Sequence, residues 1–138
     1  MANRLQEQIA VSDYAVALPF QATNVPDANT TANSVEPTSP DYVAQYNGCM
    51  IGLSGRHNAA LVSGTITWKP TINGTAVSGL AIVTDSSNQQ AVANAAADVI
   101  SFKRGDRIGL GMTKSGTVSP TTSDFAAHLT VLYEDVGL

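Results

Sequence analysis

The chain of 138 residues is long enough for one domain with its own hydrophobic core, so it requires neither a disulfide nor a metal to fold. Charged residues make up only 13% of it, about half the share of an ordinary soluble domain, and the net charge is −4. The seven Lys and Arg residues are scattered, which argues against nucleic-acid binding, because neutralising a phosphate backbone requires several neighbouring cations.

Cysteine content and hydropathy indicate the compartment in which the chain folds and whether it crosses a membrane. Cys49 is the only cysteine, which excludes an internal disulfide and the usual cysteine-based metal patterns, and fits folding in a cytoplasm. The N-terminus has no apolar signal segment, and no window approaches the roughly 18 to 20 apolar residues of a membrane span. A surface with so few charges tends to associate, so we expect sister subunits or a larger assembly to cover much of it.

Residues 1–41 differ in composition from the rest and are predicted to form an N-terminal arm and a linker-like loop. Residues 9–20 fit an extended segment, and Pro19 argues against a long helix there. Residues 21–41 are rich in Thr, Asn, Ser, Ala and Pro. The arm can reach onto a neighbouring molecule or fold back on its own domain. Its apolar residues alternate along the chain: Ile9, Val11, Tyr14, Val16, Leu18 and Phe20.

Residues 42–138 are predicted to form an all-β domain, an antiparallel sandwich of short strands separated by turn residues. In the strand expected at 63–72, Trp68 falls on the apolar face and is predicted to be buried in the core. Asn73-Gly74 is predicted to close this strand with a tight turn. The last strand has the alternation of a central strand. The strands are expected at 48–57, 63–72, 79–84, 89–94, 98–102, 106–113 and 126–134.

Two segments within this domain need a choice between structures. Residues 98–112 are predicted to be a hairpin, because Gly105 can adopt positive φ and Asp106 can bond the local backbone between two β-type runs. Residues 89–99 are rich in alanine and have a helical alternative. They lack an apolar stripe at helical spacing, so a strand followed by a loop is preferred.

No catalytic or metal-binding pattern accompanies these elements. His57 and His128 have no acidic or histidine neighbour at the spacing of a metal pair, and His128 is expected at the solvent or at an interface. No serine lies in a Gly-x-Ser-x-Gly elbow. The acidic residues are explained by ordinary roles at strand ends, although folding could still bring two carboxylates together. We therefore expect a non-enzymatic protein without a cofactor or a metal.

Several short motifs in fixed order give this chain a family resemblance. They are Gly-Cys-Met-Ile-Gly-Leu-Ser at 48–54, Ala-Ala-Leu-Val-Ser-Gly-Thr-Ile-Thr at 59–67, Ile-Asn-Gly-Thr at 72–75, Phe-Lys-Arg-Gly-Asp-Arg-Ile-Gly at 102–109 and Thr-Thr-Ser-Asp-Phe at 121–125. This block resembles the jelly-roll domains of tailed-bacteriophage virion proteins. Those domains are similar in outline to the trimeric tumour-necrosis-factor and C1q-like fold, in which a Gly-Asp-x-hydrophobic element opens a late strand.

The resemblance implies homotrimers that either decorate a capsid or form the heads of tail and fibre proteins. The short chain, which has no fibrous shaft, favours a decoration protein that binds the major capsid protein on the outside of a phage head after synthesis in the host cytoplasm. A receptor- or glycan-binding tail head is the alternative. No nucleic acid or membrane partner is expected. The predicted anchor to the capsid is the arm, through Tyr14, Val16, Leu18 and Phe20.

Overall fold

The computed structural model describes residues 14–23 and 41–134, so the predictions for Ile9, Val11 and most of the linker-like loop lie outside the described residues. Every regular element in this part of the chain is a β-strand, and it contains no helix long and apolar enough to cross a membrane. The strands are β1 (Tyr14–Ala22), β2 (Tyr42–Val43), β3 (Gly48–His57), β4 (Ser63–Ile72), β5 (Thr75–Ala76), β6 (Ile82–Thr84), β7 (Gln90–Asn94), β8 (Ser101–Phe102), β9 (Arg107–Ser119) and β10 (Phe125–Tyr133).

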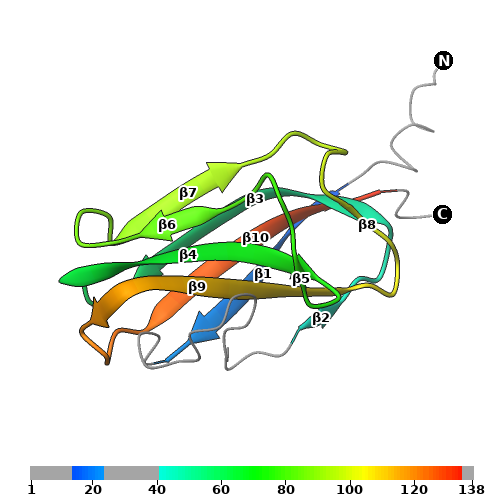
Figure 1. Cartoon of the computed structure of the whole chain (residues 1–138). Coiled ribbons are helices and arrows are strands. Elements are labelled where there is room, and N and C mark those ends of the chain that lie inside the picture. Colours follow the sequence, from blue (N-terminus) through cyan, green and yellow to red (C-terminus); the bar gives the residue numbers. More distant parts are fainter. Residues whose placement is uncertain (1–13, 24–40, 135–138) are drawn as a thin grey trace, which may run out of the picture.

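The strands form two antiparallel sheets that face each other, which confirms the predicted all-β sandwich (Figure 1). Sheet A has the order β1-β10-β3-β7, and β8 pairs with the beginning of β3 beyond the end of β7. Sheet B has the order β2-β9-β4-β5, and β6 also pairs with β4. The last strand, β10, lies between β1 and β3, as its alternation predicted for a central strand.

The described part of the N-terminal arm is an integral strand of the sandwich. β1 pairs with β10 over its whole length, from Tyr14 opposite Tyr133 to Ala22 opposite Phe125. Pro19 is tolerated because β1 is an edge strand, where a residue without a backbone N–H removes no hydrogen bond from the interior of the sheet. Residues 14–22 therefore fold back on their own domain.

The core lies between the sheets, and aromatic stacking fixes its centre. Trp68 of β4 is fully buried, as predicted, and its ring stacks on Phe125 of β10 with a centroid distance of 3.7 Å and an interplanar angle of 7°. The Phe125 ring lies directly over Gly55 of β3, where the Cβ of any other residue would collide with it. A glycine at this position thus allows the ring to bridge the two sheets.

The prediction of a hairpin at residues 98–112 is wrong, although the predicted turn at Gly105 and Asp106 is confirmed. Gly105 has a φ of 93°, and the Asp106 carboxylate accepts a hydrogen bond from the Lys103 backbone N–H at 2.9 Å. The two strands that the turn joins belong to different sheets, since β8 pairs with β3 whereas β9 pairs with β2 and β4. Phe102 and Ile108 on either side both point into the core, so the turn serves as a crossover between the sheets.

Other local predictions are confirmed. Asn73 and Gly74 have φ values of 52° and 85° and form the tight turn between β4 and β5. Residues 90–94 are the strand β7 rather than a helix. The sequence did not predict β2 and β5, because two residues are too few to show an alternation. Strand β9 was predicted to end at 113 but continues to Ser119.

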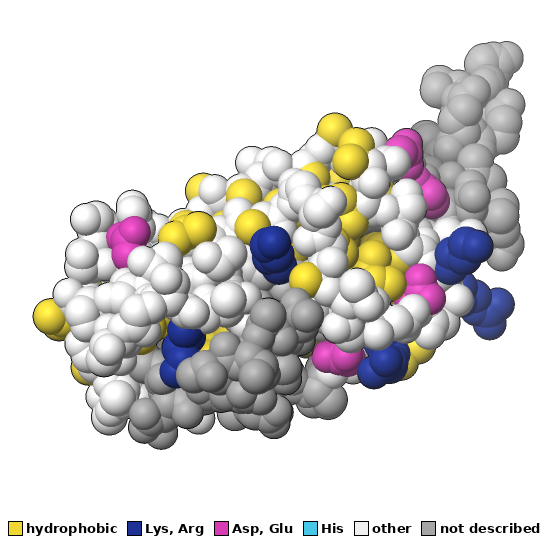
Figure 2. All heavy atoms as spheres, viewed as in Figure 1, with side chains coloured by type: hydrophobic (Ala, Val, Ile, Leu, Met, Phe, Trp, Pro, Cys, Tyr) yellow, Lys and Arg dark blue, Asp and Glu magenta, His cyan; other side chains and the backbone are white. Residues whose placement is uncertain are grey.

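Charge is unevenly distributed over the molecule. Figure 2 shows that most charged side chains on the drawn face gather at the end of the sandwich that carries β2, β5 and β8 (Figure 1). The turn between β8 and β9 contributes Lys103, Arg104 and Asp106 there, followed by Arg107 at the start of β9. Much of the remaining described surface in this view consists of backbone and uncharged side chains, with hydrophobic groups between them.

Candidate interaction surface

The outer face of sheet A is a broad surface with few charged side chains. On each strand it consists of the residues that alternate with those in the core. One row runs across all four strands, from Pro19 through His128 and Ser54 to Val92. We call the following residues the charge-poor face: Ala15, Ala17, Pro19, Gln21, Ser54, Arg56, Gln90, Val92, Asn94, Ala126, His128, Thr130 and Leu132. Arg56 is the single member with a permanent charge.

At β7 the charge-poor face ends at a strand edge that no other described strand covers. The Gln89 carbonyl accepts a hydrogen bond from the His57 N–H (3.1 Å), and the Ala95 N–H donates to the Ile51 carbonyl (3.0 Å). Because backbone groups alternate in direction along an antiparallel strand, those of residues 90, 92 and 94 point away from β3. β7 has no charge, proline or bulge of the kind that protects an edge, and Val92 is 72% exposed. A further strand can therefore pair here.

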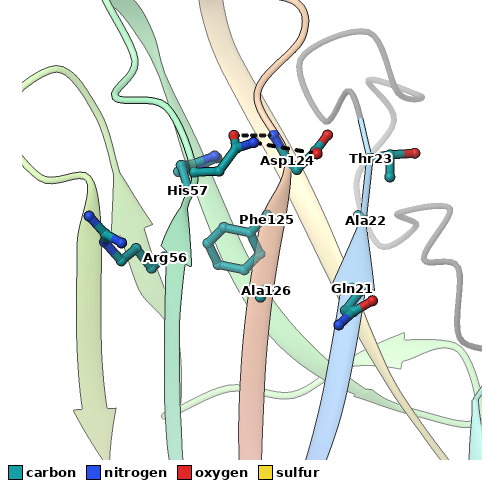
Figure 3. Close-up of a pocket in the computed structure, with 9 residues that line it drawn as sticks. Gln21, Ala22, Thr23, Arg56, His57, Asp124, Phe125 and Ala126 are labelled. Atoms are coloured by element: carbon teal, nitrogen blue, oxygen red, sulfur yellow. Dashed lines mark hydrogen bonds between the residues drawn. The ribbon is translucent and has the colours of Figure 1, made fainter.

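Two shallow hollows lie at the end of sheet A near Arg56. One, with a volume of about 480 Å³, lies on the charge-poor face between β7 and β10 and is lined by side chains that include Arg56, Val92 and His128. The other, of about 380 Å³, lies at the ends of β1, β3 and β10 and is drawn in Figure 3. His128 is exposed at the first of them, which agrees with its predicted position at the solvent or at an interface.

The hollow in Figure 3 is rimmed by polar groups held in a fixed arrangement. The Asn58 side chain donates to the Asp124 carboxylate at 3.4 Å, and its oxygen accepts from the Asp124 backbone N–H at 2.9 Å. Gln21 and Thr23 stand on the β1 side, and Arg56 stands on the opposite side (Figure 3). Amide, carboxylate, hydroxyl and guanidinium groups of this kind can hydrogen-bond a hydroxyl-rich ligand.

Behind this hollow lies a buried chain of hydrogen bonds centred on His57. Trp68 Nε1–H donates to Thr84 Oγ1 at 3.3 Å, and the Ser123 hydroxyl donates to the Ala59 carbonyl at 2.8 Å. His57 connects the two, with Nε2 at 2.9 Å from Thr84 Oγ1 and Nδ1 at 3.1 Å from Ser123 Oγ. Every group is satisfied when His57 is neutral with its proton on Nδ1. Burial lowers the pKa of His57 to about 4, in agreement with this neutral form.

This chain of hydrogen bonds holds groups of the core in a fixed arrangement. The side chains of its members, His57, Thr84, Ser123 and Trp68, are all fully buried. The network joins β3 of sheet A to β4 and β6 of sheet B. No pattern in the sequence could reveal it, because its members are separated by 16 to 66 positions along the chain.

The four residues predicted as an anchor occupy different environments. Leu18 and Phe20 are buried in the chain's own core, and Phe20 meets the Tyr42 ring edge-on at a centroid distance of 5.3 Å. Val16 is half-buried, and Tyr14 is 45% exposed beside the ring of Tyr133. An anchoring role for the four stays a prediction. Tyr14 is the member with the most surface available for a partner.

Comparisons with known proteins add a distant likeness. No family model matches the chain, and no curated protein matches it. Among solved structures, the chain is similar to one in a structure described as the acidic stable capsid structure of Helicobacter pylori bacteriophage KHP30. The two chains are 8% identical with a TM-score of 0.48, and the match covers 88% of this chain and 93% of the other. A likeness of this size assigns no role to any residue here.

Proposed function

We propose that this protein is a non-enzymatic structural component of a phage virion, a homotrimeric decoration protein that binds the major capsid protein on the outer surface of the head. The observation that carries the proposal is the charge-poor face, a broad sheet surface with one permanent charge that ends at the open edge of β7. Such a surface is suited to burial against protein, since few charges would have to be desolvated. The sequence resemblance to phage virion domains points in the same direction.

The strand order supports a jelly roll. When the two-residue strands β5 and β8 are set aside, sheet A contains β1, β10, β3 and β7, and sheet B contains β2, β9, β4 and β6, with strands from the two ends of the chain adjacent in each sheet. A double-sheet arrangement of eight strands with crossovers between the sheets is the architecture of many viral capsid domains and of lectins. The crossover at residues 103–106 is one of these connections.

The proposed mechanism is stabilisation by mass action. A protein that binds the assembled lattice and not its dissociated subunits stabilises the lattice by the free energy of binding. Three copies held together multiply weak individual contacts through their effective concentration. A rigid sandwich with a flat, weakly charged face can supply such contacts without any chemistry.

Imaging of intact particles tests the proposal most directly. We expect an antibody or gold label against this protein to mark the outer surface of the head, and purified protein to raise the temperature at which heads lacking it come apart. A label found on the tail, or heads whose stability does not respond to the protein, would contradict the decoration role.

A receptor- or glycan-binding head of a tail or fibre protein is the alternative, favoured by the polar rim of the hollow in Figure 3. It requires labelling of the tail and binding of saccharides or host cells by the isolated protein. Asp124→Asn should then weaken saccharide binding, because it removes the negative charge at the rim while an amide can still accept the Asn58 hydrogen bond.

A further inference from the structure

Three side chains capable of binding a metal meet at the end of sheet A where β8 pairs with β3. Cys49 lies in β3, Asp98 lies in the connection between β7 and β8, and Glu134 directly follows β10. The thiol sulfur and one carboxylate oxygen from each acid all lie within 4.8 Å of one another. Figure 1 shows the three segments together at one end of the sandwich.

The burial of Cys49 is unusual for its position. Along β3 the side chains of Met50 and Leu53 pack in the main core cluster between the sheets, whereas Cys49 lies opposite Leu132 on the other side of the sheet and outside that cluster. It is nevertheless 0% exposed. Among the described residues no hydrogen bond to its thiol is found. Within the described part of the chain, this buried thiol thus has no hydrogen-bond partner and faces two carboxylates, an arrangement that a bound cation would satisfy.

We propose that Cys49, Asp98 and Glu134 form a binding site for a divalent transition-metal ion of the zinc type. A thiolate selects borderline and soft metals over Mg²⁺ and Ca²⁺, and two carboxylates complete a ligand set that Zn²⁺ accepts. With metal–ligand bonds of about 2.0 to 2.3 Å, tetrahedral ligands lie roughly 3.5 Å apart. Small side-chain rotations would bring atoms within 4.8 Å to that spacing. The fourth position would hold water or a further ligand.

The charges and protons of the site balance. Binding displaces the thiol proton to solvent, and the resulting thiolate and two carboxylates together carry one more negative charge than the ion neutralises. Proton release makes the affinity rise with pH. The ion would cross-link β3, the β7–β8 connection and the end of β10, which are distant in sequence. It would therefore stabilise the folded chain by an amount that depends on its affinity.

Each proposed ligand can be replaced by a side chain of similar shape without straining the backbone. Asp98 has a φ of 67°, a left-handed conformation that asparagine also tolerates, so Asp98→Asn removes the charge without straining the loop. Glu134→Gln and Cys49→Ser are similarly close in shape. Asp85→Asn is the matched control, since Asp85 is an acidic loop residue elsewhere whose hydrogen bonds to Ser87 and Asn88 an amide oxygen can also accept.

The experiment titrates the full chain with Zn²⁺ by calorimetry and with Co²⁺ by absorption spectroscopy. We expect one ion per chain, a thiolate-to-cobalt charge-transfer band that disappears in Cys49→Ser, and Zn²⁺ affinity lowered by about tenfold or more in Asp98→Asn and Glu134→Gln. Asp85→Asn should behave like the parent, and Zn²⁺ should raise the melting temperature of both. Absence of Zn²⁺ binding, a cobalt complex without the thiolate band, or affinity that none of the three site substitutions lowers would overturn the proposal.

Discussion

His57 makes the stability of this protein sensitive to acid. Burial lowers its pKa to about 4 in the folded chain, from the value of 6.5 that an exposed histidine of an unfolded chain has. Between these values the unfolded chain takes up a proton that the folded chain does not. The free energy of unfolding therefore decreases as the pH is lowered through this window, by up to about 1.4 kcal/mol per pH unit. The contribution is complete above pH 6.5 and is lost as the pH approaches 4.

The prediction is checked by denaturant unfolding between pH 7 and pH 4. His57→Gln should lose most of this slope, whereas His128→Gln, which changes an exposed imidazole, should keep it. Asp106 does not contribute to this slope. Hydrogen bonds from the Lys103 backbone and the Asn73 side chain hold the pKa of the Asp106 carboxyl below its usual value, so its stabilisation is lost only at a pH more acidic than the His57 window. An NMR titration of the parent in which the His57 resonances shift near pH 6.5 would contradict the prediction even if His57→Gln does not fold.

Strand β1 shows how a segment that looks like a detachable arm can be a structural strand. Its alternation was visible in the sequence, and the structure uses the same alternation to bury Leu18 and Phe20 on one side and expose Gln21 on the other. The sequence could not decide between a neighbour and the chain's own domain, because an apolar row specifies that a strand is covered and not what covers it. The pairing with β10 spans more than a hundred residues.

Phe20→Ala separates a core role from an anchoring role. We expect it to lower the free energy of unfolding in urea by about 3 to 5 kcal/mol, because it leaves a cavity beside Tyr42. Ala17→Ser on the exposed side of the same strand should change stability by less than about 0.5 kcal/mol. If Phe20→Ala left stability unchanged and abolished attachment to heads, Phe20 would be an anchor and not a core residue. Tyr14→Ala is the variant expected to weaken attachment while the fold is kept.

Across the whole molecule, the sequence predicted the parts that depend on local chemistry. Alternation located β3 and β4 at their observed bounds, and turn residues located the Asn73-Gly74 turn and the turn at Gly105. What it could not predict depends on pairing at a distance. The crossover after β8, the His57 network and the convergence of Cys49 with two acids each require knowledge of which strands are neighbours.

The charge-poor face should determine how the molecule associates. Ala17→Asp and Val92→Asp place a charge on opposite margins of this face, on β1 and β7, at exposed positions where the fold can accept it. Under the proposed function, we expect each to shift the proposed trimer toward monomer or to reduce the proposed attachment to heads, because a carboxylate would have to be desolvated. Light scattering and co-sedimentation with heads measure the two effects. Thr113→Asp, exposed on sheet B, is the control, and identical behaviour of all three variants would contradict a role for this face.

The pairing of β1 with β10 also has a consequence for biosynthesis. The first described strand pairs with the last one, so sheet A cannot be completed until the residues of β10 have left the ribosome. Contacts of such high sequence separation make folding slow. Until then Leu18, Phe20 and the edge of β3 that β10 will cover remain open to other nascent copies. Rapid synthesis of many copies would thus favour misassembly, and a lower expression temperature should raise the yield of folded protein.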